Sequence, residues 1–397
     1  MQGSVVVIPD WIWFVFTFAF GCCIGSFLNV VIYRLPRDKS LVTPPSSCPA
    51  CGKHIRSYDN IPLVSWLFLG GRCRFCKAPI SPRYFIIELL TGLLFLGLFI
   101  LFFRSGIRTG IPPLLDGGWF VYLASLIMLS AFIAASAIDL ELWIIPLSIC
   151  WFVTAIGIIS SAVAPYVIDR ELIRQPPMLV PSTSDILLGE TALASLAAGA
   201  SIGLAISHLL LATGLIKRSY DLAPITGSTP APQSSAEQPD LNDRIEVCKE
   251  LFFLLPVVVC SIAVYWLVKR FPSNFAWWLQ FSQTPVVAGL LGGLWGYFIG
   301  CGIVWATRIL GTLAFGKEAM GLGDVHLMGA AGTILGPLYV IVAFFIAPFF
   351  GLIWAGIQMF SKKTRQIPYG PFLSLGVLAV IILHDSIMAY ISFLFFG

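Results

Sequence analysis

Two aspartates set in apolar sequence are the residues of this chain best placed to do chemistry. Asp324 ends a Gly-x-Gly-Asp motif at 321–324, with apolar runs before and after it, and Asp139 lies in the apolar stretch 136–140. A carboxylate in such surroundings is costly unless it serves a function. The two glycines of the motif let the backbone turn sharply and approach another helix closely. We therefore interpret the two aspartates as one site, which the rest of the chain brings together.

Four cysteines form a second group whose spacing suits a metal. They occur as two C-x-x-C pairs in one polar loop, Cys48 with Cys51 and Cys73 with Cys76. Tetrahedral zinc takes four thiolates, and pairs at this spacing supply them with little backbone strain. Two disulfides or four free thiols are the alternatives. Four cysteines leave no open position for a substrate, so we expect the zinc to be structural. The remaining cysteines lack such spacing and are expected to be packing residues: Cys22, Cys23, Cys150, Cys248, Cys260 and Cys301.

The composition is that of a membrane protein. The chain has 397 residues, of which 58% are hydrophobic and 11% are charged, and its mean hydropathy is +0.89. Many apolar runs approach or exceed the ~20 residues that a spanning helix needs, and they lack the strict alternation of a membrane barrel. We predict an all-α polytopic membrane protein whose partner is the lipid bilayer and which binds no nucleic acid. No cleavable signal peptide is evident.

About ten transmembrane helices are predicted, with a small zinc-knuckle domain between the first and the second. A polar outer loop is expected at 169–185, and a flexible linker rich in Pro, Ser and Gln at 220–250. The last span is expected to reach its outer end at His384 and Asp385, which leaves 386–397 at the outer interface. The predicted spans are 11–33, 84–103, 119–138, 149–167, 193–216, 251–268, 285–306, a short one at 325–338, 339–360 and a last one that begins at 370.

The charge of the loop between the first two helices sets the predicted orientation. Basic residues fill the stretch 34–83, in which Asp38 and Asp59 are the acidic residues. Loops with such a bias face the cytoplasm, so the N-terminus is expected outside. Counting the spans from there puts Asp139 and Asp324 at the same, cytoplasmic side of the membrane. The reducing cytoplasm also disfavours disulfides among the four loop cysteines.

Several further stretches, in their order along the chain, carry a resemblance to a known family. The sequence resembles the prepilin leader peptidases of type IV pilus and type II secretion systems. The matching stretches are GSFLNVVIYRLP at 25–36, the two C-x-x-C pairs, YDNIPLVSW at 58–66, ISPRY at 80–84, ELLTG at 88–92, AIDL at 137–140, GLGD at 321–324 and PYGPF at 368–372.

The resemblance implies a bifunctional enzyme, a membrane aspartyl protease and N-methyltransferase. It implies that Asp139 and Asp324 are the catalytic pair of an aspartic endopeptidase. That enzyme would cleave the short basic leader of prepilins or pseudopilins after Gly and then methylate the new N-terminal residue. The implied methyl donor is S-adenosylmethionine, although the sequence contains no G-x-G-x-x-G donor motif. The implied location is the bacterial inner membrane, with cleavage at the cytoplasmic side.

The same resemblance divides the chain into two regions. Residues 1–103, which hold the first two helices and the cysteine loop at 34–83, correspond to the methyltransferase-associated region. Residues 119–397 correspond to the aspartyl peptidase domain, with an inserted helical pair and linker at about 168–284. One departure is His326, because the family usually has Lys two residues after the second aspartate. A histidine titrates near neutral pH, so the pH response or a substrate contact could differ.

Other interpretations of single residues stay open at this point. Asp139 could be an interfacial residue, and Asp324 could cap a helix. A transporter or channel could use both carboxylates for protons or ions, and a protease of the presenilin type would lack methyl transfer, but neither has a use for the cysteine loop. Glu88 could serve methyl transfer or pair with a basic loop residue. Asp59 could be structural, and His208 is expected to be a packing residue.

Overall fold

The structure, a computed structural model, describes residues 9–168, 190–216, 219, 243–361 and 368–396. Within these residues, nine helices are long and apolar enough to cross a membrane by length and composition, and one shorter apolar helix accompanies them. The predicted all-α polytopic fold is confirmed. The helices are α1 (Asp10–Arg34), α2 (Val64–Phe68), α3 (Pro82–Phe103), α4 (Gly118–Leu142), α5 (Leu147–Val167), α7 (Glu190–Ala212), α8 (Asp243–Arg270), α9 (Ala276–Ser282), α10 (Pro285–Phe315), α11 (Leu322–Leu335), α12 (Pro337–Ser361) and α13 (Gly370–Phe396).

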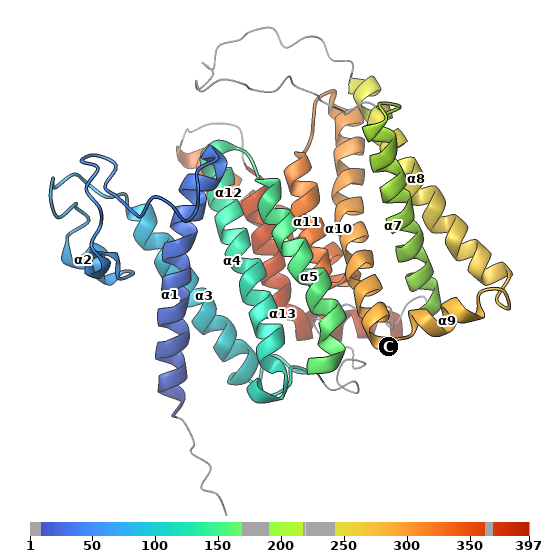
Figure 1. Cartoon of the computed structure of the whole chain (residues 1–397), viewed down its shortest axis with the longest axis horizontal. Coiled ribbons are helices and arrows are strands. Elements are labelled where there is room, and N and C mark those ends of the chain that lie inside the picture. The colour runs from blue at the N-terminus through green and yellow to red at the C-terminus, as the bar shows by residue number, and fades with distance from the viewer. Residues whose placement is uncertain (1–8, 169–189, 217–218, 220–242, 362–367, 397) are drawn as a thin grey trace, which may run out of the picture.

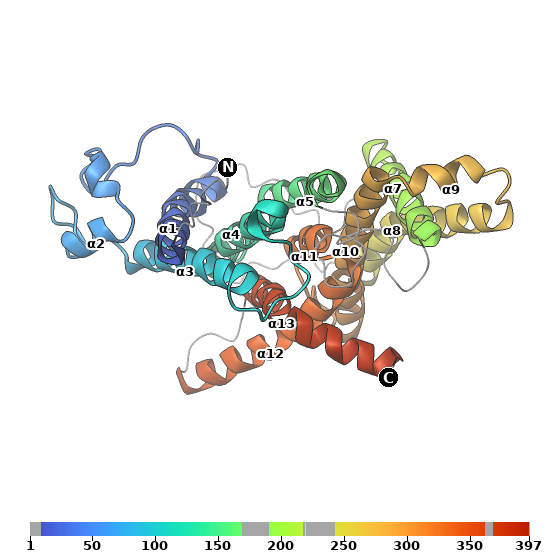
Figure 2. The same ribbon diagram turned by 90° about the horizontal axis from the view of Figure 1, so that it is seen from below.

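The helices form one bundle with three parts side by side (Figure 1). Helices α1 and α3 stand at one edge and carry the cysteine loop, α4, α5 and α10 to α13 form the centre, and α7 and α8 stand at the opposite edge. The view from below shows the same order (Figure 2). The cysteine loop leaves the ends of α1 and α3 that lie at the top of Figure 1, where α4 also ends and α11 begins.

Helix α11 is the most enclosed element of the centre. Nearly all of its side chains are buried, between α5 and α10. Close approach is possible because glycines face each other: a Cβ on Gly296 or on Gly332 would run into the carbonyl of the other. At 14 residues it spans about 21 Å, short of the ~30 Å hydrocarbon core. Its contacts with α5 and α10 enclose it, and it corresponds to the short predicted span at 325–338.

The helical pair α7 and α8 packs through small residues. A Cβ on Gly199 or Gly203 of α7 would collide with the backbone of α8, and the Ser207 hydroxyl of α7 donates to the Phe253 carbonyl at 2.6 Å. His208 is exposed, and its ring meets that of the same Phe253 edge-on with centroids 5.6 Å apart, a packing contact between α7 and α8. Buried alanines of α7 contact Leu291 of α10. The pair is therefore held to the centre through α10.

The predicted linker ends earlier than expected. Residues 220–242 lie outside the described residues, but 243–250 already belong to α8. Two carboxylates account for the difference. Glu246 is buried and pairs with Lys249 one turn later at 2.5 Å, and Glu250 is buried against an arginine of α10. In the sequence, the polarity of Glu246 and Glu250 favours a loop. In the structure, their ion pairs allow both residues to lie inside a helix.

The terminal helix continues beyond His384 and Asp385. Helix α13 runs through both residues, and its last part lies across the end of the bundle in Figure 1. The His384 side chain is fully buried. Asp385 accepts from Arg108 at 2.8 Å and from the Thr109 backbone N–H at 2.6 Å, so it fastens the loop after α3 to α13. The predicted outer loop at 169–185 lies outside the described residues.

Candidate active site and candidate metal centre

Asp139 lies in the last turn of α4. The helix ends when Trp143 adopts a left-handed conformation (φ 59°), and the Trp143 N–H donates to the Asp139 carbonyl at 3.0 Å. The Asp139 carboxylate is buried, and its Oδ2 accepts the backbone N–H of Gly370 at 3.0 Å. Gly370 is the first residue of α13. One carboxylate oxygen of Asp139 is thus fixed by a helix more than two hundred residues away in sequence.

Asp324 lies in the first turn of α11. Its Oδ2 accepts the backbone N–H of Gly321 at 3.3 Å, which makes Asp324 part of the helix cap, as the helix-capping interpretation expected. The cap uses only one oxygen. The other, Oδ1, is buried without a hydrogen-bond partner. A buried carboxylate oxygen without a partner is costly in a purely structural residue, so the cap alone does not account for Asp324.

The two aspartates come together around Ile145, in the short turn between α4 and α5. A Cβ on Gly323 would lie 2.7 Å from the Ile145 Cβ, and a Cβ on Gly370 would lie 2.9 Å from its Cδ1. The same Cβ on Gly370 would lie 2.8 Å from Asp139 Oδ2. Both glycines are therefore needed for this close approach. The two carboxylates are near enough to interact electrostatically.

Sequence reasoning missed a polar network that holds the segment before Asp324. Arg308 of α10 is 1% exposed, and its Nε donates to Glu250 of α8 at 2.9 Å. Its Nη1 donates to Glu318 at 2.6 Å and also to the carbonyl of Met320, directly before the Gly-x-Gly-Asp motif. Trp305 donates to the second oxygen of Glu250 at 2.9 Å. Arg308 lies two residues beyond the seventh predicted span at 285–306, so the available signal was a charged residue at the end of an apolar run.

His326 contacts aromatic residues of α5 and α10. Its Nδ1 lies 3.0 Å from the hydroxyl of Tyr297 on α10, and its ring lies 5.3 Å from that of Trp151 on α5. The side chain therefore fills the interface between α5, α10 and α11. The expectation that this residue alters the pH response or contacts a substrate stays a prediction.

The four loop cysteines converge. All four sulfur atoms lie within 4.8 Å of one another, and Cys48 Sγ is 3.8 Å from Cys76 Sγ. Four thiolates around a zinc ion with Zn–S bonds of about 2.3 Å stand about 3.8 Å apart. None of the described cysteines forms a disulfide. Backbone N–H groups of Cys76 and Phe75 lower the pKa of Cys73 to about 6, whereas the Ala78 backbone hydrogen bond to Cys76 is outweighed by burial and the neighbouring thiols, which raise the pKa of Cys76 to about 11. The sulfur positions therefore carry the metal assignment.

The two cysteine pairs are built in the same way. In each, the first cysteine donates its N–H to the residue five positions later, Cys48 to Lys53 at 3.0 Å and Cys73 to Ala78 at 2.9 Å. The residue before the acceptor has a left-handed backbone, which is Gly52 (φ 70°) in the first pair and Lys77 (φ 59°) in the second. The geometry is that of two equivalent metal-binding turns.

Asp59 links the middle of the loop to the second pair. It accepts three hydrogen bonds from the Arg74 guanidinium, at 2.6 to 3.0 Å. These bonds hold the pKa of Asp59 below its usual value. The residue thus stabilises the loop, as the structural interpretation expected.

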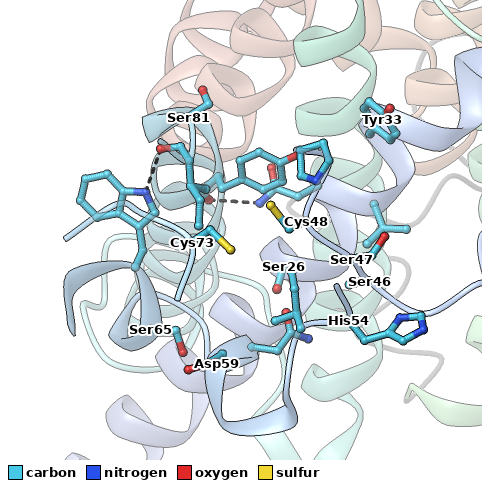
Figure 3. Close-up of a pocket in the computed structure, with 18 of the residues that line it drawn as sticks. Ser26, Tyr33, Ser46, Ser47, Cys48, His54, Asp59, Ser65, Cys73 and Ser81 are labelled. Carbon is cyan, nitrogen blue, oxygen red and sulfur yellow. Dashed lines mark hydrogen bonds between the residues drawn. The ribbon is translucent and has the colours of Figure 1, made fainter. Parts of the chain in front are cut away.

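A large pocket lies between the cysteine loop and the adjoining ends of α1 and α3 (Figure 3). Its volume is about 1190 Å³. Ser26, Cys48, Asp59, Ser65 and Cys73 line it and are labelled in the figure.

Two buried polar residues of the helices line the same pocket. Glu88 of α3 accepts the backbone N–H of Leu63 through Oε2 at 2.7 Å, and among the described residues no basic side chain pairs with it. Pairing with a loop base was therefore wrong for Glu88. Asn29 of α1 donates to the Tyr84 carbonyl at 3.1 Å.

Comparison with known proteins identifies two segments of the chain. Residues 19–102 match a family described as Bacterial Peptidase A24 N-terminal domain, and residues 252–356 match one described as Type IV leader peptidase family. The first match contains the cysteine loop. The second begins inside α8 and contains Asp324 but not Asp139. The predicted division at 1–103 and 119–397, and the insertion at about 168–284, stay predictions.

Curated relatives point in the same direction. A prepilin leader peptidase/N-methyltransferase of Myxococcus xanthus is 47% identical over 135 residues, 34% of this chain and 36% of that relative. One from Klebsiella pneumoniae is 36% identical over 179 residues, 42% of this chain and 72% of that relative. The type 4 prepilin-like proteins leader peptide-processing enzyme of Escherichia coli is 28% identical over 382 residues, 92% of this chain and 91% of that relative. No solved structure gives a significant match.

Proposed function

This chain belongs to the prepilin leader peptidase/N-methyltransferase family, and from that premise we propose that it carries out both reactions of the family name. It cleaves the short basic leader of type IV prepilins or pseudopilins after Gly and methylates the new N-terminal residue. The resemblance expected from the sequence is thereby confirmed. The observation that carries the peptidase assignment is the convergence of Asp139 and Asp324 at one end of the bundle.

The two aspartates hydrolyse the peptide bond as a pair. Hydrolysis without a covalent intermediate needs one group to take a proton from water and another to give a proton to the leaving amide. Two neighbouring carboxylates do this by sharing one proton, because like charges at short range do not both ionise. The backbone N–H groups of Gly370 and Gly321 hold one oxygen of each carboxylate. The other oxygens remain for water and the scissile amide.

The site works at the cytoplasmic side of the bacterial inner membrane. The positive loop at 34–83 supports this orientation, and both aspartates lie at the end of the bundle from which that loop leaves. Water reaches this depth, whereas it does not reach the middle of a bilayer. The apolar helix of the substrate would lie in the bilayer beside the spans, with its leader toward the cytoplasm.

One structural zinc ion holds the cysteine loop. The fit rests on the sulfur positions, since the sulfurs of Cys48, Cys51, Cys73 and Cys76 all lie within 4.8 Å of one another and one pair stands at the 3.8 Å expected around a tetrahedral zinc ion. All four positions are taken by thiolates, so zinc has no part in the chemistry. Its role is to fix the loop that forms one wall of the pocket in Figure 3.

Methylation uses S-adenosylmethionine, which supplies an electrophilic methyl group when bound. The pocket residues fit such a molecule, because Glu88 offers a buried carboxyl group that can pair with a cationic donor and Asn29 Oδ1 is buried without a hydrogen-bond partner. What the chain itself must do is hold the new amino terminus next to this pocket. The pocket and the aspartate pair lie at the same end of the bundle, so a cleaved substrate moves between them without crossing the membrane.

The test is leader cleavage by Asp139→Asn and Asp324→Asn. Each change keeps the shape of the side chain and its backbone N–H contact but removes the shared proton. Purified variants in lipid vesicles should cleave a prepilin substrate about 10²- to 10⁴-fold more slowly than the wild type. Asp10→Asn, at the other end of the membrane helices, is the matched control and should cleave normally. Cleavage at a wild-type rate by either folded active-site variant would refute the dyad and favour a transporter.

A further inference from the structure

We propose that the methyl donor binds in the pocket between α1, α3 and the cysteine loop, with the Glu88 carboxylate and the Asn29 amide oxygen as its polar contacts. The proposal rests on the proposed methyltransferase function and deepens it by assigning the donor's polar contacts. Nothing in the sequence marks a nucleotide-type donor site, so the pocket has to be argued from its geometry.

Close packing of the two helices places these residues side by side. A Cβ on Gly25 of α1 would lie 2.7 Å from the Glu88 Cα, and one on Gly21 would lie 2.9 Å from the Gly92 Cα. The helix backbones are therefore in direct contact. Asn29 comes one turn after Gly25 on the same face, so its amide and the Glu88 carboxylate both reach the pocket where the helices leave the contact.

Glu88 is a buried carboxyl group that no basic side chain among the described residues pairs with. The residue is 8% exposed, and its contacts within the chain are the Leu63 N–H and the Ser26 hydroxyl. Burying a charged carboxylate is costly unless a cation compensates it. Two cationic groups are present in S-adenosylmethionine, the sulfonium and the amino-acid ammonium. Either would stabilise the ionised form of the Glu88 carboxyl group, which no basic side chain among the described residues does.

Asn29 contributes an acceptor that the fold leaves unused. The side chain is 3% exposed and its amide nitrogen is occupied by the Tyr84 carbonyl, which fixes the orientation of the group. Its Oδ1 is buried with no partner. An acceptor of this kind is rare unless a ligand or water completes it. The donor offers several N–H and O–H groups that would do so.

Size and position agree with this occupant. Ligand pockets commonly measure about 300–1,000 Å³, and the volume here is about 1190 Å³. The remaining space is enough for the amino terminus of a substrate to enter. Cys48 and Cys73 belong to the wall, so loss of the metal would open the pocket.

The decisive variant is Glu88→Gln, because glutamine still accepts the Leu63 N–H and the fold is retained. Purified full-length, zinc-loaded protein would be titrated calorimetrically with S-adenosylmethionine in the absence of peptide. Loss of one charged contact should weaken binding about 10- to 100-fold. Asp10→Asn is the matched control, since it removes a carboxylate that pairs with Arg104 at 2.7 Å at the far end of the same two helices. Its affinity should equal that of the wild type.

The outcomes distinguish an error in the pocket assignment from an error in the proposed methyltransferase function. If Glu88→Gln binds the donor as tightly as the wild type while the wild type methylates pre-cleaved peptide, the pocket assignment is wrong and the methyltransferase function stands. A wild-type protein that methylates peptide but does not bind the donor alone also contradicts a preformed pocket. If the wild type neither binds the donor nor methylates, the proposed function fails together with the pocket.

Discussion

The cysteine loop and the aspartate pair are assembled in opposite ways. Each cysteine pair is closed by hydrogen bonds within six residues, and the two pairs belong to one short loop. The aspartates come from α4 and α11, and the residue that fixes Asp139 comes from α13. One centre is therefore a local structure that a metal can complete. The other exists only when helices far apart in sequence pack correctly.

This difference predicts which lesions stay local. Damage to the cysteine loop should affect the pocket that the loop encloses and leave the bundle intact. Damage to the contacts among α8, α10 and α11 should displace Asp324 and leave the loop intact. The following changes test that separation.

The largest effect outside the aspartates is expected for the double variant Cys48→Ser, Cys51→Ser. Half of the thiolate ligands are removed, so the protein should lose its single zinc ion. Methylation should fall far more than cleavage, because the loop walls the pocket but does not touch the aspartates. Metal analysis of the purified variant and both activity assays check this. Undiminished zinc would contradict the ligand assignment, and equal loss of both activities would contradict the separation of the centres.

An intermediate effect is expected for Arg308, as a positioning residue for Asp324. Removing its hydrogen bond to Met320 should let the Gly-x-Gly-Asp segment move. A displacement of about 1 Å can cost about 10²-fold in rate. We expect kcat for cleavage to fall about 10- to 100-fold in Arg308→Met, with KM unchanged and with partial recovery in Arg308→Lys.

The control for Arg308 removes its buried partner as well. If Arg308 alone were replaced, Glu250 would be left buried without its partner, which is destabilising. The double variant Arg308→Met, Glu250→Met removes both charges of the pair. It should fold and bind zinc as the wild type does, yet still cleave slowly. A double variant with wild-type kcat would show that the network only stabilises the bundle.

The smallest effect is expected for the linker. Residues 220–242 are rich in Pro, Ser and Gln, a composition typical of flexible connections. Deleting about ten of them should leave cleavage and methylation within about twofold of the wild type, as measured in the same vesicle assays. Complete loss of activity in a folded deletion variant would mean that this segment has a function of its own.

Much of the fold was predictable because membrane helices can be recognised in a sequence from their length and hydropathy. The short helix α11 was also predicted from its apolar run. Counting the spans predicted that Asp139 and Asp324 lie at the same side of the membrane. The cysteine cluster needed only the spacing of Cys48, Cys51, Cys73 and Cys76. These features depend on local sequence or on the alternating direction of successive spans. Neither requires knowledge of how the helices pack.

The contacts that complete the sites were not predictable. Glu250 was assigned to a linker because its polarity outweighed the apolar residues after it, and only its pairing with Arg308 reveals a helix. Gly370 gave no sign that its N–H holds Asp139. That Asn29 and Glu88 line one pocket depends on the close crossing of α1 and α3 at Gly25. Each of these is a contact between distant elements, and a single sequence contains no record of it.

The most direct test of two separate centres is one crossed experiment. Asp324→Asn and Glu88→Gln would each be supplied with labelled methyl donor and, in parallel, with intact prepilin and with a pre-cleaved peptide. We expect Asp324→Asn to lose cleavage and still methylate the pre-cleaved peptide, and Glu88→Gln to cleave normally and lose methylation. Loss of both activities in either folded variant would contradict the separation of the two centres.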